Sequence, residues 1–202
     1  PVKGSFKEYS IFTCGPWCQG PIVAQTLQML ESDDLPAIGH NSSTYIHLVS
    51  QALNLSFSDR HHYYGDPDFV DVPIEGLLSK SYTRTRRDMI DMSKAFSGMP
   101  DPGNPWAYQE GTTGKHPAQK LTALPGEQDQ DTSYTCVVDR WGNSFSAPPS
   151  DAVFGSPIVP GLGLIISSRG TQSWLEKDHP SCIAPWKRPR LTPNPAMAFK
   201  NG

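Results

Sequence analysis

The sequence predicts an α+β fold in which helices come first and β strands follow. Residues 22–31 and 42–58 carry apolar side chains at helical spacing, whereas alternating apolar and polar residues begin after position 132. Between these regions, residues 97–130 are rich in Gly, Pro, Gln and Thr and follow no clear period. With 202 residues, the chain is long enough for one ordinary domain with a sizeable core.

The first half of the chain contains three expected helices. The first, over residues 22–31, follows a Gly-Pro start, and the second, over residues 42–58, has Asn41 or Ser42 as its N-cap. A third helix is expected from about Leu77 to Met92. Two smaller features accompany it, namely a turn at Asp66-Pro67-Asp68 and a solvated helix side with Arg84, Arg86 and Arg87.

The second half contains the expected strands. A first strand follows Thr132, with Tyr134, Cys136 and Val138 on one face, and it turns at Gly142-Asn143 into a second strand over 144–147. Further on, residues 158–166 are apolar and punctuated by glycine, which is typical of a buried strand. The sequence therefore predicts a division at Thr132 into regions 1–131 and 132–202.

Composition excludes several partners. The formal net charge of −3 gives no electrostatic reason to expect nucleic acid or an anionic membrane surface. No apolar run is long enough to span a bilayer, and we recognise no N-terminal signal peptide. The chain opens with Pro1-Val2-Lys3-Gly4 and without an initiator Met, so we expect a processed product or an excised segment.

The four cysteines do not predict a metal site. Cys14 and Cys18 form a CxxxC pair, but no second pair and no suitably spaced histidine accompany it. We therefore expect free or buried thiols, with Cys136 as a small apolar filler on a core strand and Cys182 as the fourth. Neither a metal nor a cofactor is expected.

Several stretches together resemble the γ-glutamyltranspeptidase family of N-terminal-nucleophile (Ntn) hydrolases, in the family's order and spacing over nearly all of the chain. The stretches are Asp59-Arg60 with Gly65-Asp66-Pro67-Asp68-Phe69-Val70, then Thr132 to Asn143, then Phe154-Gly155-Ser156 with Ile158-Val159-Pro160-Gly161, and finally Ala184-Pro185-Trp186-Lys187-Arg188-Pro189 followed by Asn194-Pro195. The resemblance implies a partial four-layer αββα sandwich. Residues 1–131 would be the end of a large subunit with its linker, and residues 132–202 the start of a small subunit.

The resemblance also implies a mechanism centred on Thr132. A zymogen would cleave itself between Asp131 and Thr132, and the freed Thr132 would then attack an amide and form an acyl-enzyme. Its α-amine, which titrates near neutral pH, would serve as the base. The alternative for Thr132 is a β-strand threonine with a packing role. The implied partner is a small-molecule amide such as a γ-glutamyl compound, as in glutathione metabolism.

The expected substrate-binding residues depart from the family's pattern. The family's Asn for the glutamyl group falls at Asp151, its Asp for the substrate's α-amino group falls at Gln172, and its Ser-Ser pair falls at Leu191-Thr192. Arg169 is a further candidate for an acidic substrate group, with a surface arginine as the alternative. Because a cation prefers a carboxylate to an amide, these changes favour the acylase or amidohydrolase branch of the family.

Three functions therefore remain open. One is a γ-glutamyltranspeptidase-like hydrolase or transferase, and the second is an Ntn acylase with a substrate that is not γ-glutamyl. The third is a non-catalytic segment, because full family members are more than twice as long and this chain lacks the parts that supply a substrate-binding arginine and the oxyanion donors. We therefore expect it to need the remainder of the same enzyme or a partner chain. The family resemblance leaves periplasmic, secreted and cytoplasmic locations open.

Overall fold

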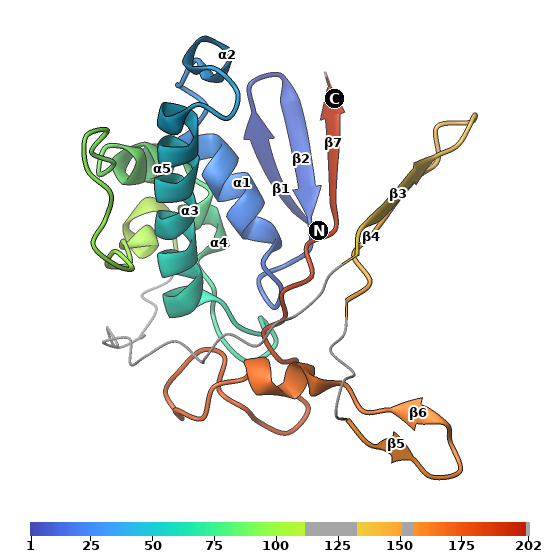
Figure 1. Ribbon diagram of the computed structural model, residues 1–202. Helices are drawn as coiled ribbons and strands as arrows, with labels where there is room; N and C mark the ends of the chain where they lie inside the picture. The colour runs from blue at the N-terminus through green and yellow to red at the C-terminus, as the bar shows by residue number, and fades with distance from the viewer. Residues whose placement is uncertain (112–132, 151–155, 201–202) are drawn as a thin grey trace.

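The computed structural model describes residues 1–111, 133–150 and 156–200. A group of helices lies on one side of a three-stranded sheet, and two separate hairpins extend on the other side and below (Figure 1). The α+β class predicted from the sequence is confirmed. The chain does not begin with a helix, however, because two strands that the sequence analysis missed come first.

The three-stranded sheet joins the two ends of the chain. Its antiparallel order is β1 (Val2–Phe6), β2 (Tyr9–Thr13) and β7 (Ala196–Lys200), with Ile11 opposite both Gly4 and Ala198. A Cβ atom on Gly4 would lie 2.5 Å from the Cβ atom of Ala24, so this glycine lets the first helix pack directly on the sheet. Residues on both sides of position 132 thus share one sheet, and the division into two regions stays a prediction.

The helices form a layer that covers the sheet. α1 (Gly20–Met29) contacts both the sheet and the helices α3 (Ser43–Tyr63) and α5 (Lys80–Arg87). Short turns complete the layer: α2 (Leu35–Ile38), α4 (Ile74–Leu77) and the 3-10 helix η1 (Pro105–Tyr108). The first two expected helices are confirmed, and the Ser42 hydroxyl caps α3 by accepting a hydrogen bond from the Tyr45 amide at 3.1 Å. The third expected helix is shorter than predicted, because α5 covers Lys80–Arg87 and not the whole of residues 77–92.

A buried ion pair lies at the centre of the helical layer. Arg86 of α5 was expected on the solvated side, but it is 2% exposed and its Nη2 lies 3.1 Å from Asp59 Oδ1. Asp59 also accepts hydrogen bonds from Gln25 and Tyr82 at Oδ2 and from the Gly103 amide at Oδ1. Asp59, which lies in α3, therefore joins this helix to α1, to α5 and to the loop before η1.

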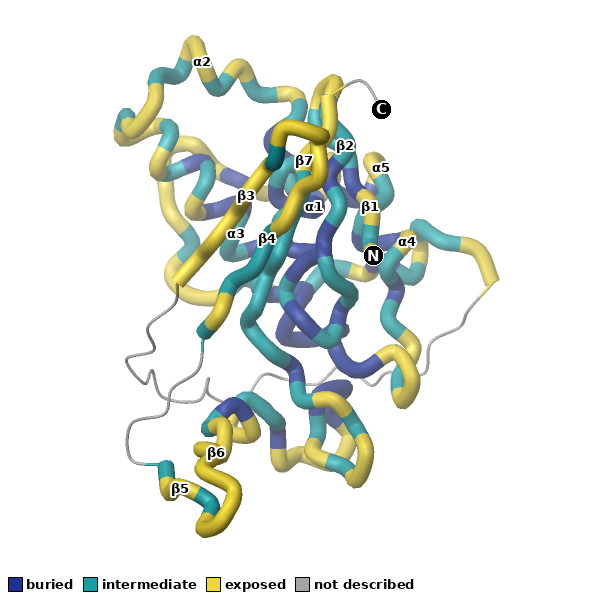
Figure 2. The backbone as a smooth tube through the Cα atoms, turned by 90° about the vertical axis from the view of Figure 1, so that its right-hand side faces the viewer, coloured by how far each residue is buried: buried dark blue, intermediate teal, exposed yellow. Residues whose placement is uncertain are grey.

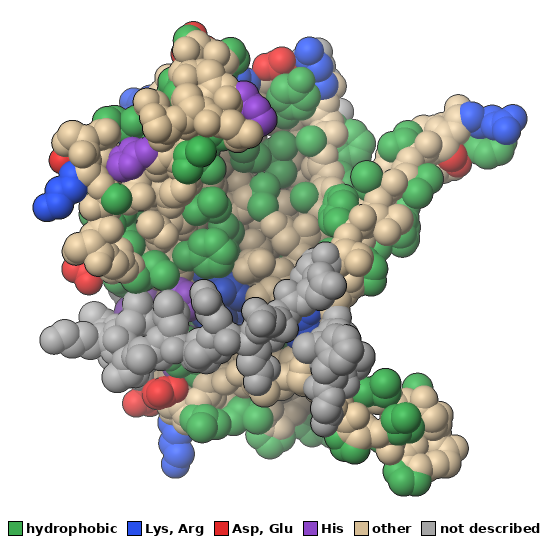
Figure 3. Space-filling view, in the orientation of Figure 1, with side chains coloured by type: hydrophobic (Ala, Val, Ile, Leu, Met, Phe, Trp, Pro, Cys, Tyr) green, Lys and Arg blue, Asp and Glu red, His purple; other side chains and the backbone are tan. Residues whose placement is uncertain are grey.

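Two hairpins leave their apolar side chains exposed (Figures 2 and 3). β3 (Thr135–Val138) pairs with β4 (Ser144–Ala147), which confirms the predicted hairpin, and β5 (Ile158–Val159) pairs with β6 (Leu164–Ile165). The expectation of burial here was wrong for both hairpins. Cys136 is exposed, and residues 158–166 form a turn with Gly161 and Gly163 at positive φ rather than one buried strand. No described part of the chain packs over these faces.

Among the described residues, no helix is long and apolar enough to cross a membrane.

Candidate active site

Motifs from opposite halves of the chain meet at Asp66. This buried carboxylate accepts hydrogen bonds from the Arg188 guanidinium at 2.6 and 3.0 Å and from the Arg188 amide at 2.8 Å. The guanidinium also reaches Asp68 at 2.6 Å. These interactions, chiefly the side-chain hydrogen bond from Arg188, lower the pKa of Asp66 despite the opposing effect of burial. The turn at residues 65–70 and the basic run at residues 187–190 are therefore one structural unit.

A second contact fixes the segment around His179. A Cβ atom on Gly65 would lie 2.4 Å from the Pro180 carbonyl oxygen, so only glycine allows this approach. The Ser181 hydroxyl donates to the Tyr64 carbonyl at 2.6 Å, and the His179 ring stacks on Trp174 with centroids 4.2 Å apart. The end of α3 thus supports the segment that leads to Arg188.

Arg169 connects three segments of the chain, at residues 150, 168–172 and 192. It lies in the 3-10 helix η2 (Ser168–Gln172), is 7% exposed, and donates to the Thr192 hydroxyl at 2.6 Å. It also donates to the Ser150 carbonyl at 2.8 Å and to the Ser150 hydroxyl. One residue earlier, the Pro149 carbonyl accepts a hydrogen bond from the Ser133 amide at 3.3 Å. Hydrogen bonds, together with the peptide bond between Pro149 and Ser150, therefore connect Thr192 to Ser133.

The structure brings together some of the expected site residues. Arg169 and Thr192 are in direct contact, and half-buried Gln172 ends the same 3-10 helix as Arg169. Thr132, the cleavage position Asp131 and Asp151 lie outside the described residues, although Ser133 and Ser150 adjoin them. The roles of these residues stay predictions. Arg169 is buried and internally bonded, which differs from an arginine on the open surface.

Sequence reasoning missed Ser150, Arg60 and Arg190 as members of this region. Arg60 donates to the Leu191 carbonyl at 3.4 Å, and Arg190 donates to the Arg60 carbonyl at 3.5 Å. Arg190 also lies over the Trp174 ring at 5.6 Å. The only available signal was the closeness of these residues to recognised motifs, because buried arginines that donate to backbone carbonyl groups carry no sequence pattern of their own.

Two buried histidines beside Arg190 are neutral at physiological pH. The Ser181 amide donates to His179 Nδ1 at 3.0 Å, so Nε2 carries the proton and donates to the His61 carbonyl at 2.9 Å. Burial first, and then Arg190, lowers the pKa of His179 to about 4. The same two causes, followed by Arg60, lower the pKa of His61 to about 3. His62, the residue after His61, is buried as well.

We expect acid to destabilise the fold through these histidines. Below the unfolded pKa of about 6.5, the unfolded chain binds protons that the folded chain excludes, so stability present above that pH is lost as pH falls towards about 4 for His179 and about 3 for His61. The free energy of unfolding should fall by about 1 kcal/mol per histidine between pH 7 and pH 5.5. Urea unfolding at several pH values measures this. His179→Gln should flatten the slope, whereas His40→Gln at an exposed site should leave it unchanged.

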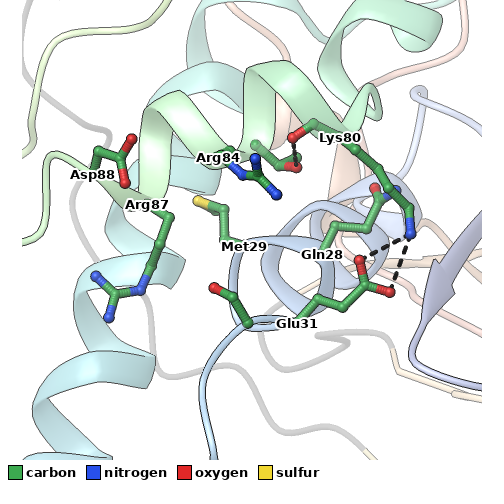
Figure 4. A pocket seen from close by; sticks show the side chains of 9 residues that line it. Gln28, Met29, Glu31, Lys80, Arg84, Arg87 and Asp88 are labelled. Carbon is green, nitrogen blue, oxygen red and sulfur yellow. Dashed lines mark hydrogen bonds and ion pairs between the residues drawn. The ribbon is translucent and has the colours of Figure 1, made fainter.

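A separate cleft of about 440 Å³ lies between α1 and α5 (Figure 4). Its charged lining is largely paired, since Lys80 contacts Glu31 at 3.0 Å and Arg87 holds Asp33 through two hydrogen bonds. In the described parts of the chain, no group of three or more His, Cys, Asp or Glu side chains is placed to hold a metal ion. This cleft shares none of its lining residues with the hydrogen-bonded region around Arg169.

Comparison with known proteins places these features in a family. The chain is 32% identical over 205 residues to the glutathione hydrolase proenzyme of Bacillus subtilis subsp. natto, covering 100% of this chain and 34% of that protein. It is 33% identical over 208 residues to the acylase ACY 1 proenzyme of Pseudomonas sp. (strain V22), covering 100% of this chain and 33% of the relative. The chain thus spans about a third of the length of these relatives.

The fold agrees with the sequence comparison. The structure superimposes on the cephalosporin acylase from Bacillus halodurans with a TM-score of 0.74 at 24% identity, covering 100% of this chain and 32% of the other. This likeness shows a shared fold, of which this chain covers a part. The family model for gamma-glutamyltranspeptidase matches residues 1–202. Because that match extends over the whole sequence, the chain belongs to the gamma-glutamyltranspeptidase family.

Proposed function

We propose that this chain carries the nucleophile of a self-processing amide hydrolase or transferase. The family match across position 132, with Thr132 just before β3, is the observation that carries the proposal. Relatives at about 32% identity are proenzymes, which supports activation by cleavage. The new N-terminus would be Thr132, and residues 1–131 and 132–202 would belong to different subunits.

The proposed chemistry uses one hydroxyl twice. In the precursor, the Thr132 hydroxyl attacks the carbonyl of Asp131, so that an ester forms, the Asp131–Thr132 peptide bond breaks and the α-amine takes up a proton. Water then hydrolyses the ester, which frees the Thr132 hydroxyl and leaves a carboxylic acid on Asp131. In turnover, that amine takes the hydroxyl proton while the oxygen attacks the substrate amide, and the proton passes to the leaving amine. The resulting acyl-enzyme is transferred to water or to an amine acceptor.

Arg169 is proposed as a positioning residue for this chemistry. Its guanidinium is held by Thr192 and Ser150, and Ser150 follows the residue that binds the Ser133 amide. A buried, multiply bonded arginine can keep these segments in register around Thr132. In this proposal the head group of the substrate binds to Asp151, Gln172 and Thr192. Arg169 is a further candidate for binding an acidic group of the substrate.

The second candidate is an acylase whose substrate lacks the γ-glutamyl group. Gln172 stands where the family has an aspartate for the substrate's α-amino group, and an amide binds an ammonium less strongly than a carboxylate does. An acylase proenzyme is as similar to this chain as the glutathione hydrolases are. This observation favours a broader amide substrate.

The third candidate, a segment without activity of its own, is linked to the exposed hairpins. Large apolar side chains such as Val138 and Trp141 are 72% and 77% exposed, and the chain spans about a third of its relatives. We therefore propose that the remainder of the enzyme covers β3–β4 and β5–β6 and completes the site. Activity tests consequently require the full-length protein.

Substrate class is tested with chromogenic amides. Full-length protein is assayed for kcat/KM on a γ-glutamyl anilide and on anilides of simple dicarboxylic and aliphatic acids. Preference for the first supports the transpeptidase function, and preference for the others supports an acylase. No turnover by a correctly processed protein contradicts both.

We expect Gln172→Asp to shift this preference. A carboxylate at this position should raise kcat/KM for the γ-glutamyl anilide by about fivefold, because a hydrogen bond to a charged group is stronger by roughly 1 kcal/mol. The other anilides should not gain. Thr171→Asp provides the control, since it adds the same charge at the exposed neighbouring position. An equal gain from both variants would assign the effect to general electrostatics.

A further inference from the structure

The backbone directly before Thr192 is held by residues from the first half of the chain. The Leu191 amide donates a hydrogen bond to the Trp17 carbonyl at 2.9 Å. On the opposite side of the same peptide unit, Arg60 of α3 donates to the Leu191 carbonyl at 3.4 Å. The position of Thr192 is therefore set by the turn that follows β2 and by α3.

Asp66 holds the same segment three residues earlier, at Arg188. Its carboxylate is buried, and its Oδ2 accepts a hydrogen bond from the Arg188 amide at 2.8 Å. Its Oδ1 accepts from the Arg188 Nε and Nη2 at 3.0 and 2.6 Å, and from the Asp68 amide at 3.2 Å. Both oxygens thus face donors only, which suits an ionised carboxylate and does not suit a carboxamide.

Trp17 connects these two sets of contacts. The Arg188 guanidinium, which Asp66 orients, lies over the Trp17 ring at 5.6 Å from its centroid. The carbonyl of the same tryptophan accepts the hydrogen bond from Leu191. A continuous path of direct contacts therefore leads from the Asp66 carboxylate to the residue next to Thr192.

We propose that Asp66 is a positioning residue that sets the place of Thr192 for substrate binding. This inference rests on the proposed function, in which Thr192 binds the head group of the substrate. Asp66 acts through Arg188 and the backbone, and it keeps the Thr192 hydroxyl where it accepts from Arg169 at 2.6 Å. Its effect is therefore on substrate affinity and not on the chemistry of the nucleophile.

The positioning contacts cross the proposed cleavage position. Asp66 and Trp17 lie in residues 1–131, whereas Arg188 and Thr192 lie in residues 132–202. In the processed enzyme, one subunit would thus set the geometry of a substrate-binding residue that belongs to the other subunit.

The first test measures hydrogen exchange in the full-length protein. Asp66→Asn turns an amide nitrogen towards at least one donor, so the peptide that covers residues 187–193 should exchange at least about tenfold faster. Residues 48–56 in α3 should exchange as in the unaltered protein, which excludes general unfolding. Asp68→Asn is the matched control, because Asp68 contacts the same guanidinium at 2.6 Å but its side chain is 74% exposed. It should leave both exchange rates unchanged.

Kinetics distinguish positioning from a merely structural role. Asp66→Asn should raise KM about tenfold for the anilide that the unaltered protein turns over best, and it should change kcat by less than about twofold. This split is expected because Thr192 binds the head group equally in the ground state and the transition state. Cleavage before Thr132 should remain complete, and Asp68→Asn should keep the KM of the unaltered protein.

A second pair of variants covers the case in which Asp66→Asn does not fold. Arg188→Gln removes the guanidinium from Asp66 at a side chain that is 42% exposed, and it should give the same changes in exchange and in KM. Arg188→Lys keeps the positive charge beside the carboxylate and should give smaller changes.

The two measurements separate this inference from the proposed function. Unchanged exchange of residues 187–193 in both Asp66→Asn and Arg188→Gln would overturn the positioning role, as would faster exchange with an unaltered KM. Absence of turnover in the unaltered protein would instead contradict the proposed function. In that case the exchange rates still show whether Asp66 holds the segment that carries Thr192.

Discussion

Replacing Thr132 with alanine is expected to leave the full-length protein as one uncut species. The unaltered protein should instead give two fragments that meet at Asp131 and Thr132, because the hydroxyl that attacks the Asp131 carbonyl is the one removed. Amide hydrolysis should fall by at least about 10⁴-fold, as for other enzymes that lose their nucleophile. Intact mass on a denaturing column, followed by N-terminal sequencing of the smaller fragment, measures the first effect.

Two variants separate this chemistry from a general loss of structure. Thr132→Ser keeps a hydroxyl and should still be cleaved, at a reduced rate. Ser133→Ala removes a hydroxyl from the next, exposed residue and keeps the backbone amide that binds Pro149, so it should be processed normally. Cleavage of Thr132→Ala at the same position, or failure of Ser133→Ala to be cleaved, would contradict the assignment of the nucleophile.

Local patterns predicted much of the fold. The helical spacing of residues 22–31 and 42–58 gave α1 and α3, and Ser42 was a recognisable cap. The hairpin β1–β2 was not predicted because Gly4 occupies a buried position in β1, where close packing against Ala24 excludes a side chain. A buried position without an apolar residue breaks the alternation on which a strand prediction depends.

Charged and exposed residues were predicted less well because their environment is not local. Arg86 looks like a surface residue until Asp59 of another helix is known to pair with it. The hairpin β3–β4 has the alternation of a core strand, but its burial depends on what packs over it. The contact of Arg169 with Ser150 and Thr192 joins residues 19 and 23 positions apart, and no single motif contains them. Family resemblance indicated Arg169 and Thr192 individually and did not indicate their contact.

The second large effect is expected from the buried carboxylate at Asp59. Asp59→Ala should lower the free energy of unfolding by about 3–5 kcal/mol, because it leaves the Arg86 guanidinium buried without its carboxylate. Gln25 and Tyr82 would also lose their acceptor. Asp59→Asn should recover only part of the free energy of unfolding that Asp59→Ala loses. Both carboxylate oxygens accept from donors, so the amide nitrogen would face at least one of them.

Urea unfolding followed by circular dichroism measures these changes, with two variants for comparison. Tyr82→Phe removes one donor and keeps the ion pair, so it should cost only about 1 kcal/mol. Glu8→Gln removes a carboxylate that pairs with Lys200 on the surface, and its unfolding midpoint should not move, because solvent already screens that pair.

The decisive variant is Asp59→Leu combined with Arg86→Met. If the cost of Asp59→Ala arises from an unpaired buried cation, the apolar pair should recover most of the lost stability. If the double variant is as unstable as Asp59→Ala, the hydrogen bonds to Gln25, Tyr82 and Gly103 stabilise the helical layer more than the ion pair does.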